Sequence, residues 1–557
     1  MKYFKILLPF FFPVIVVLLS SLLNRASTTT PHRSYQQPEN TDSVQYQHKF
    51  FSTAANCMSC HNGMMSQSGK DVSIGTDWRA TMMANSARDP YWHAAVRREV
   101  MDHPSAKAEI EDECSTCHMP MAHTRSNMQG KHGEVFSHLP AGKAATQKDM
   151  LAVDGVSCTT CHQITSENFG KRESFVGQFG IDSTSPMGQR NIYGPYHVDT
   201  GQTRIMHSSS GFRQKQSAHI QESELCAPCH TLYTKSLGPE GNVIGELPEQ
   251  VPYLEWRHSA FKDEQSCQSC HMPELEKPTP IASTSSQPRP NFSQHSFRGG
   301  NFFMLRILNR YRDELGVKAL PQEMNESINR TENFLEDASA RITINDFSVR
   351  RDTLRASINI RNLAGHKLPT AYPSRRVWLH IKATTPQGET VFESGAVNAD
   401  GSIAGNDNDR SPEQYEPHHK TIRGEDQVQI YEAIMVGPDD QVTTGLLSAV
   451  RFIKDNRLLP KGFNKTTADE DIAVQGTAYQ DEDFRGGRDQ VKLEIPLSVS
   501  EDSLKLTAEL HYQPIAYRWA QNLDSYESSE TNRFTGYYNS MSEVSSRQLT
   551  QDQITLE

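Results

Sequence analysis

The sequence predicts a chain of two unlike parts: a mainly α-helical and irregular part up to about residue 300, and an all-β sandwich from about residue 338. Three observations support this division. All ten cysteines lie before residue 271, and long Gly-, Ser- and Asn-rich passages interrupt the helical stretches of the first part. Alternating apolar and polar runs separated by turn residues fill the second part. The expected segments are 1–25, a linker 26–45, a domain 46–300, a helical connector 301–337, a sandwich 338–520 and a polar tail 521–557.

The N-terminus has the pattern of an export signal. Lys2 and Lys5 precede an apolar run from Ile6 to Leu23, and a positive start before an apolar stretch is typical of secretory signal peptides. The run is at the lower edge of membrane-spanning length and lacks a good cleavage site, so a retained anchor is the alternative. We therefore expect an exported chain, periplasmic or membrane-anchored facing the periplasm, with the cell surface as a further option.

The cysteines form five Cys-x-x-Cys-His motifs with none left over. The motifs are Cys57/Cys60/His61, Cys114/Cys117/His118, Cys158/Cys161/His162, Cys226/Cys229/His230 and Cys267/Cys270/His271. Two thiols at this spacing add across the vinyl groups of haem, and the histidine that follows supplies one axial ligand to the iron. The sequence therefore predicts five covalently bound haem c groups with the motif histidines as proximal ligands, which makes residues 46–300 a pentahaem cytochrome c domain.

Three other uses of paired cysteines compete with this interpretation. Zinc sites do not require a histidine after each second cysteine, and redox-active dithiols use one motif rather than five. Disulfides within the motifs would close very short loops and would stabilise the fold little. The haem interpretation is therefore favoured.

The remaining elements follow from periodicity. Helical patterns cover Asp77–Val100, Lys107–Cys114 and Asn301–Leu335, with a Pro/Ser-rich connector at 276–291. Strands are expected at residues 341–349, 353–360, 376–383, 390–394, 428–436, 490–497 and 504–512. Their alternation and the turns between them favour a sandwich of about seven or eight strands. The Ser-, Glu- and Gln-rich end from about residue 522 is expected to be mobile.

Each six-coordinate iron needs a second axial ligand. The candidate distal histidines are His138, His207, His219, His258, His295 and His366. Rival methionine ligands, which would raise the reduction potential, are Met82, Met83, Met119 and Met121. Any of these side chains can instead be an ordinary core or surface group. We expect mostly bis-histidine haems, with one methionine-ligated or five-coordinate iron as the alternative.

Two groups of segments resemble known cytochromes. The segments Gly155–His162, Ser223–Leu232, Tyr253–Trp256 and Ser266–Pro273 resemble the multihaem cytochrome c superfamily, which includes the tetrahaem cytochromes of ammonia oxidisers, the pentahaem nitrite reductases and the octahaem hydroxylamine oxidoreductases. The segments Asn362–Thr370, Tyr415–His419 and Lys454–Phe463 look like the C-terminal region of large exported bacterial multihaem cytochromes. The second resemblance implies that His366 could reach a haem from the β domain. The alternative is a tight turn in which His366 bonds the backbone.

The sequence departs from the nitrite reductases at one decisive position. Their catalytic iron is bound through a Cys-x-x-Cys-Lys motif, whereas all five motifs here end in histidine. We therefore expect an electron carrier, with no catalytic residue assigned, that moves electrons through its haems between respiratory redox partner proteins, among them a membrane quinol-oxidising module. Membrane association would occur through the N-terminus. The net charge of −11 argues against nucleic-acid partners.

Two alternatives to the carrier function stay open. One is a multihaem oxidoreductase that reduces or oxidises a small nitrogen or sulfur compound at an open-site haem. The other makes the β-sandwich a docking module for a partner or a carbohydrate.

Overall fold

The computed structural model describes residues 50–143, 146–186, 188–284, 286–497 and 503–556. The predicted signal or anchor (1–25) and linker (26–45) therefore lie outside the described residues. Within the described ranges, no helix is both long and apolar enough to cross a membrane.

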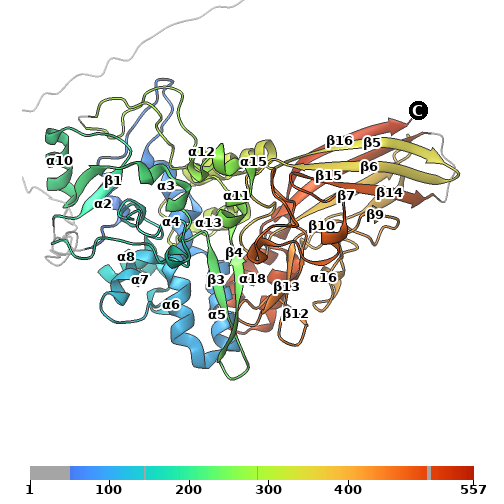
Figure 1. Cartoon of the computed structure of the whole chain (residues 1–557), viewed down its shortest axis with the longest axis horizontal. Helices are drawn as coiled ribbons and strands as arrows, with labels where there is room; N and C mark the ends of the chain where they lie inside the picture. Colours follow the sequence, from blue (N-terminus) through green and yellow to red (C-terminus); the bar gives the residue numbers. More distant parts are fainter. Residues whose placement is uncertain (1–49, 144–145, 187, 285, 498–502, 557) are drawn as a thin grey trace, which may run out of the picture. The chain divides into compact units, whose positions relative to one another are not determined.

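The motif-bearing part consists of short helices joined by long irregular segments (Figure 1). Its helices are α2 (Ala54–Met58), α3 (Ile74–Arg79), α4 (Met82–Asn85), α5 (Pro90–Asp102), α6 (Lys107–His118), α7 (Pro120–Asn127), α8 (Gln147–Val153), α9 (Cys158–Cys161), α10 (Thr200–Ser210), α11 (Pro252–Arg257) and α12 (Cys267–His271). Two small sheets join them: β1 (Asn191–Gly194) with β2 (Arg213–Gln216), and β3 (Leu232–Leu237) with β4 (Val243–Gln250).

The predicted helical stretch Asp77–Val100 is divided among α3, α4 and α5. The last break lies at Asp89-Pro90, where Asp89 caps α5 by accepting the backbone N–H of Tyr91 at 2.8 Å. Proline has no backbone N–H to donate, so it is tolerated at the first position of a helix but interrupts a helix that would continue through it. Pro90 therefore begins α5 and separates it from α4. The predicted connector helix is likewise three helices, α13 (Phe302–Arg310), α14 (Arg312–Leu315) and α15 (Pro321–Ala338).

The C-terminal part is built on two larger sheets and one small one. Its strands are β5 (Ala340–Arg350), β6 (Thr353–Asn362), β7 (Arg376–Thr384), β8 (Thr390–Ser394), β9 (Thr421–Ile422), β10 (Ile430–Tyr431), β11 (Ala433–Val436), β12 (Val442–Thr443), β13 (Arg451–Asp455), β14 (Arg488–Pro496), β15 (Leu504–Gln513) and β16 (Arg547–Leu556). One sheet has the order β5-β6-β14-β9, the second has the order β10-β7-β15-β16 with β8 also on β7, and the third has the order β12-β11-β13. A short helix, α16 (Asp407–Arg410), precedes β9.

The two larger sheets share one apolar core. Burial alternates along β6 and along β15, as the sequence pattern predicts for strands with one buried face. Ile358 of the first sheet and Leu379 and Leu506 of the second belong to the same core cluster, and all three are fully buried. The strands expected at 341–349, 353–360, 376–383, 390–394, 490–497 and 504–512 are confirmed. The expected strand 428–436 is two strands, β10 and β11, in different sheets.

The prediction of a polar, mobile tail at 521–557 was wrong. This segment contains α18 (Ser529–Asn539) and the long strand β16, and α17 (Tyr517–Gln521) leads into it. β16 pairs antiparallel with β15 along most of its length. The Phe534 ring of α18 packs on Tyr91 of α5, with ring centroids 4.9 Å apart. Polar composition was misleading because alternate residues of an edge strand, and one face of a covering helix, stay in water.

Candidate haem-attachment sites

Each Cys-x-x-Cys-His motif forms a single helical turn. The backbone N–H groups of His61, His162 and His230 donate to the carbonyl of the first cysteine of their motifs at 3.0, 3.1 and 3.0 Å. The second and fifth motifs lie within α6 and α12. Residues three and four apart on a helical turn share a face, so both thiols and the imidazole of a motif lie on the same side.

The cysteines are free thiols. All ten are unbonded and partly exposed. In the part of the chain that the structure describes, no cluster of three or more metal-ligating side chains includes a cysteine. Burial raises the pKa of Cys114 and raises that of Cys161 to about 12. Paired thiols at this spacing, followed by a histidine, fit thioether attachment to haem.

Thiols from different motifs are neighbours. The pKa of each of four thiols is raised by a nearby thiol of another motif: that of Cys158 by Cys57, that of Cys226 by Cys267, that of Cys229 by Cys117, and that of Cys161, after burial, by Cys229. These contacts link the first motif to the third, the third to the fourth, and the fourth to the second and fifth. The five motifs are therefore one connected group.

The second thiol of the first motif, Cys60, has a different environment from the thiols that face another motif. Its sulfur is predicted to bind haem, and the hydroxyl of the neighbouring Ser59 lies beside it, with Oγ 3.8 Å from Sγ. The same hydroxyl lies 2.7 Å from the Asn56 carbonyl. A hydroxyl has one proton to donate, and the shorter contact to a carbonyl is the stronger bond. The Ser59 hydroxyl therefore donates its proton to the Asn56 carbonyl, and its contact with the Cys60 sulfur is weak. The thioether bond at Cys60 stays a prediction.

The backbone of Cys60 is fixed more firmly than its side chain. Its N–H donates to the Cys57 carbonyl at 3.2 Å, and its carbonyl accepts the backbone N–H of Ser283 at 2.8 Å. The first contact belongs to the helical turn of the motif. The second joins the turn to the segment that also orients His61, so the positions of both groups depend on the same neighbour.

Four of the five motif histidines are oriented by a backbone carbonyl. The Nδ1 atoms of His61, His118 and His162 lie 2.6, 3.0 and 2.6 Å from the carbonyls of Ile281, Ser86 and Tyr193. His271 Nδ1 bonds the carbonyl of Arg298 in the same way. A carbonyl only accepts, so Nδ1 carries the proton and Nε2 keeps its lone pair.

The protonation state of these histidines also fits a metal ligand. Burial lowers the pKa of His118 and of His271, each to about 4. A neutral imidazole with a fixed Nδ1–H and an open Nε2 is what an axial iron ligand requires. The donor set of the motifs therefore fits haem c.

Two of the predicted distal histidines face a motif histidine. The rings of His162 and His295 have centroids 6.2 Å apart and an interplanar angle of 13°. The rings of His271 and His366 have centroids 6.3 Å apart and an angle of 15°.

A solved pentahaem cytochrome has a similar fold. The crystal structure of a penta-heme cytochrome c552 from Thermochromatium tepidum matches this chain with a TM-score of 0.51 and 15% sequence identity, covering 91% of this chain and 100% of that one. The shared fold therefore includes β-sheets of the C-terminal part as well as the motif-bearing part. No protein-family model and no curated protein sequence matches the chain.

The other four predicted distal histidines differ in which of their ring nitrogens already contact another polar group. His138 is buried, and its Nδ1 lies 2.7 Å from Asp149 Oδ1, a carboxylate–histidine contact that leaves Nε2 open. His207 uses Nε2 on the Gly188 carbonyl at 2.6 Å. His219 and His258 have both nitrogens engaged.

The contacts of His219 and His258 account for that difference. His219 contacts Ser217 Oγ at 2.6 Å and the Ile164 carbonyl at 2.8 Å. His258 contacts the Leu254 carbonyl at 2.8 Å and Asp469 Oδ2 at 3.2 Å. A haem iron would have to displace one of these contacts, so the ligation of a haem by His219 or His258 stays a prediction.

Sequence reasoning did not select His93. This histidine lies in α5, is buried, and has an Nδ1 with no hydrogen-bond partner. Its Nε2 bonds the Ala87 carbonyl at 3.0 Å, and burial, with a smaller contribution from nearby His118, lowers its pKa to about 4. Nothing in the sequence distinguishes His93 from a core histidine, because only the fold brings it to the second motif.

Two of the four rival methionines are core residues, and Met82 and Met83 are partly exposed. Met119 and Met121 are fully buried in two apolar clusters, and the Met121 sulfur lies 3.3 Å from Thr159 Oγ1. Both therefore have a packing role that accounts for their positions.

A buried charged network joins the two parts of the chain beside His366. Arg457 contacts Asp455 Oδ2 at 2.7 Å and Glu255 Oε1 of α11 at 2.9 Å. Lys367, which follows His366, places Nζ 2.7 Å from Asp455 Oδ2. The Thr370 hydroxyl bonds the Glu255 carboxylate as well. The two cations and two anions balance, and they fix the 362–370 loop against the helix between the fourth and fifth motifs.

A buried carboxyl group near the second motif predicts a pH dependence. Glu249 of β4 accepts the Thr234 hydroxyl at 2.5 Å, and burial raises its pKa to about 7. A raised carboxyl pKa lowers the free energy of unfolding as the pH rises from about 4.3, the unfolded value, to about 7. Glu249→Gln should remove that loss and raise the stability at pH 8 relative to pH 4 by about 3 kcal/mol.

Urea denaturation at the two pH values measures this effect. Glu246→Gln, in the same strand but exposed, is the matched control and should leave the pH dependence unchanged. An equal pH dependence in the wild type and Glu249→Gln would refute the assignment.

Proposed function

We propose that the chain is an exported pentahaem c-type cytochrome that transfers electrons through a connected group of covalently bound haems. The observation that carries this proposal is the closeness of thiols from different motifs, which joins all five motifs into one group. Groups attached to neighbouring thiols would themselves be neighbours. When bound, each haem supplies reversible one-electron exchange at its iron.

The chain's own contribution is to attach, orient and ligate. The motif thiols would form the thioethers, and the motif Nε2 atoms would bind the irons on one side. On the other side we assign His295 opposite His162 and His366 opposite His271. Two imidazoles on one metal, each about 2.0 Å away, place their ring centres about 6 Å apart, which agrees with the 6.2 and 6.3 Å spacings.

The location and partners follow from the same proposal. Haem c attachment and the N-terminal pattern favour export to the periplasm, with or without a membrane anchor. We propose redox proteins as partners, including a membrane quinol-oxidising module. The net charge of −11 favours cationic soluble partners by raising association rates.

Mass spectrometry of the haem-loaded chain tests the cofactor count. Five haems should add about 3 kDa to the processed polypeptide, and Cys267→Ala/Cys270→Ala should remove about one fifth of this increment. A protein purified from a host with cytochrome c maturation that carries no such increment would refute the proposal.

A second candidate, an oxidoreductase with one open haem, is favoured by the surroundings of His230. Among the described residues, no parallel histidine ring faces His61, His118 or His230, and of these three only His230 has an arginine, Arg375, that adds to burial in lowering its pKa. An arginine beside an open axial position could stabilise a bound anion. Electron paramagnetic resonance of the oxidised protein distinguishes the two functions: a high-spin signal that cyanide removes supports the oxidoreductase, and five low-spin haems support the carrier.

A further inference from the structure

One cluster of histidine and carboxylate side chains lies on the outer face of the β10-β7-β15-β16 sheet, away from the haem motifs. It consists of His380 on β7, Glu393 on β8, and Glu509 and His511 on β15, and we call it the sheet-face cluster. His380 and Glu509 are directly opposed across the two strands, and Glu509 and His511 are two apart and so share a face. All four side chains are half-buried.

One carboxylate oxygen connects the two histidines. Glu509 Oε2 lies 3.0 Å from His380 Nδ1 and 2.8 Å from His511 Nε2. The three ligand atoms of His380, Glu509 and His511 all lie within 4.8 Å of one another. Trp378 stacks on His511 with ring centroids 5.3 Å apart, which restricts the orientation of that ring.

The contacts of His380 leave two possibilities for its Nδ1 side. Its Nε2 lies 2.9 Å from Glu393 Oε1, and its Nδ1 lies 3.0 Å from Glu509 Oε2. Ionised carboxylates only accept, so Nε2 is protonated. At Nδ1, either a second proton makes the ring an imidazolium, or a cation occupies the space between Nδ1 and Glu509. An Nε2–H held by a carboxylate is the usual outer contact of a metal-ligating histidine.

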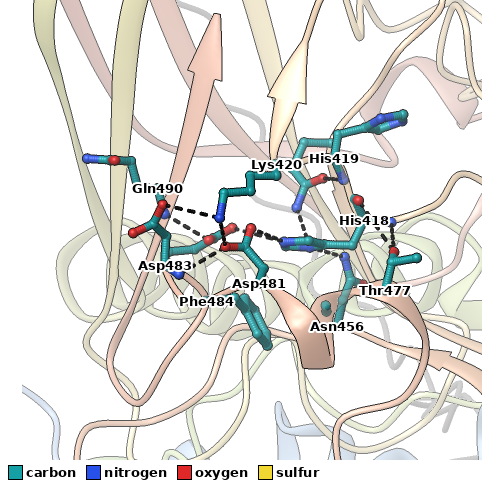
Figure 2. Close-up of polar contacts among 12 residues, drawn as sticks. His418, His419, Lys420, Asn456, Thr477, Asp481, Asp483, Phe484 and Gln490 are labelled. Atoms are coloured by element: carbon teal, nitrogen blue, oxygen red, sulfur yellow. Dashed lines mark hydrogen bonds and ion pairs between the residues drawn. The ribbon is translucent and has the colours of Figure 1, made fainter.

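A second such cluster, around His418, has the opposite hydrogen-bond pattern (Figure 2). His418 Nδ1 lies 2.9 Å from Gln429 Nε2 and 3.1 Å from Asn456 Nδ2. Both amides are oriented elsewhere, because Gln429 Oε1 accepts the His419 backbone N–H and Asn456 Oδ1 accepts the Glu432 backbone N–H. Two fixed donors require an unprotonated Nδ1, which places the proton of the neutral ring on Nε2, toward Asp481 at 3.3 Å. His418 therefore has no free nitrogen for a metal.

We propose that the sheet-face cluster binds one zinc-class divalent cation through His380 Nδ1, His511 Nε2 and Glu509 Oε2, with Glu393 as a positioning residue. Two histidines and one carboxylate are a donor set that zinc uses with a fourth position open. The site borders a cavity of about 280 Å³ that is also lined by Lys382, Lys505 and Thr507. Water or a small anion from this cavity would complete the coordination.

The present spacing is close to that of a metal site. Ligand atoms about 2.0 Å from a tetrahedral metal are about 3.3 Å apart. The two distances to Glu509 Oε2, 2.8 and 3.0 Å, differ from this value by a few tenths of an ångström. The two imidazole nitrogens lie within 4.8 Å of each other, and rotation of these partly exposed side chains would bring them to the same spacing.

Equilibrium dialysis of the untagged, haem-loaded chain against Zn²⁺, with elemental analysis, tests the proposal, because haem iron is counted separately. We expect one zinc per chain at micromolar free Zn²⁺, and at least a 100-fold loss of affinity in Glu509→Gln. Glu393→Gln should weaken binding by 10- to 100-fold. His418→Gln, in the other cluster, is the matched control and should bind zinc as the wild type does.

Zinc K-edge absorption spectroscopy separates the roles of the two glutamates. Zinc-loaded Glu393→Gln should keep the wild-type signal of two imidazoles and one carboxylate, whereas Glu509→Gln should lose it. Far-UV circular dichroism verifies that each variant is folded. Absence of bound zinc in the wild type, or equal zinc affinity in the wild type, Glu509→Gln and His380→Gln, would overturn the proposal and leave an ion-pair cluster only.

Discussion

Replacement of Arg457 by methionine is expected to lower the free energy of unfolding by about 3–5 kcal/mol. Arg457 is buried and contacts both Asp455 and Glu255. Methionine would fill most of the volume but would leave two buried carboxylates with only Lys367 to balance them. Removing one member of a buried ion network is costly because the remaining charge keeps its desolvation penalty.

The matched control is Arg451→Met. Arg451 pairs with Asp440 at the surface, and both side chains are about half exposed or more, at 49% and 73%. A solvated pair of this kind contributes less than about 1 kcal/mol. Chemical denaturation followed by far-UV circular dichroism compares the variants, and equal losses in both would contradict the assigned role of the network.

The same network predicts an acid sensitivity. Burial opposes ionisation of Asp455, but Arg457 and Lys367 outweigh it and hold its pKa at about 2. A lowered carboxyl pKa contributes stability above the unfolded value of about 3.9, and this contribution is lost as the pH falls toward 2. Arg457→Met should therefore unfold at a higher pH than the wild type in an acid titration.

Replacement of His366 by alanine is expected to convert the haem of the fifth motif from low-spin to high-spin. This prediction rests on the proposed ligation of His366 opposite His271, whose rings are parallel and 6.3 Å apart. His366→Met should instead keep six ligands and raise the reduction potential of one haem by on the order of 100 mV, because a thioether is a weaker donor than an imidazole.

Electron paramagnetic resonance and a spectroelectrochemical titration measure these two changes. His132→Ala is the matched control, because the His132 side chain is 62% exposed and pairs with Asp112 rather than with a motif histidine. Five unchanged low-spin haems in His366→Ala would exclude His366 as a ligand while leaving the covalent attachment of the haems intact.

The strands and the motif turns were predictable because their causes are local. A strand with one buried face requires alternation, and the runs at β6 and β15 contain it. A Cys-x-x-Cys-His motif needs one helical turn to bring its three donors to one side, and such a turn depends on a few neighbouring residues. The end of the chain was predicted wrongly because β16 is an edge strand and α18 covers α5, so both keep much polar surface.

The distal side of each motif depended on long-range packing. His366 lies 95 positions after His271, and its loop is held by Glu255 through contacts that no local pattern encodes. The predictions of His219 and His258 rested on closeness in sequence to a motif, and they stay predictions, because packing places Ser217, Asp469 and backbone carbonyls at the ring nitrogens.

The sequence by itself determined the five attachment motifs, their proximal histidines and the alternating strands, because covalent spacing and backbone periodicity are properties of short segments. Only the tertiary structure decided which motifs are neighbours and which histidines face them. It also decided that His380, Glu509 and His511 meet on one sheet face. Those arrangements depend on how segments far apart in the chain pack together, and the packing free energy of a whole core cannot be inferred from any single segment.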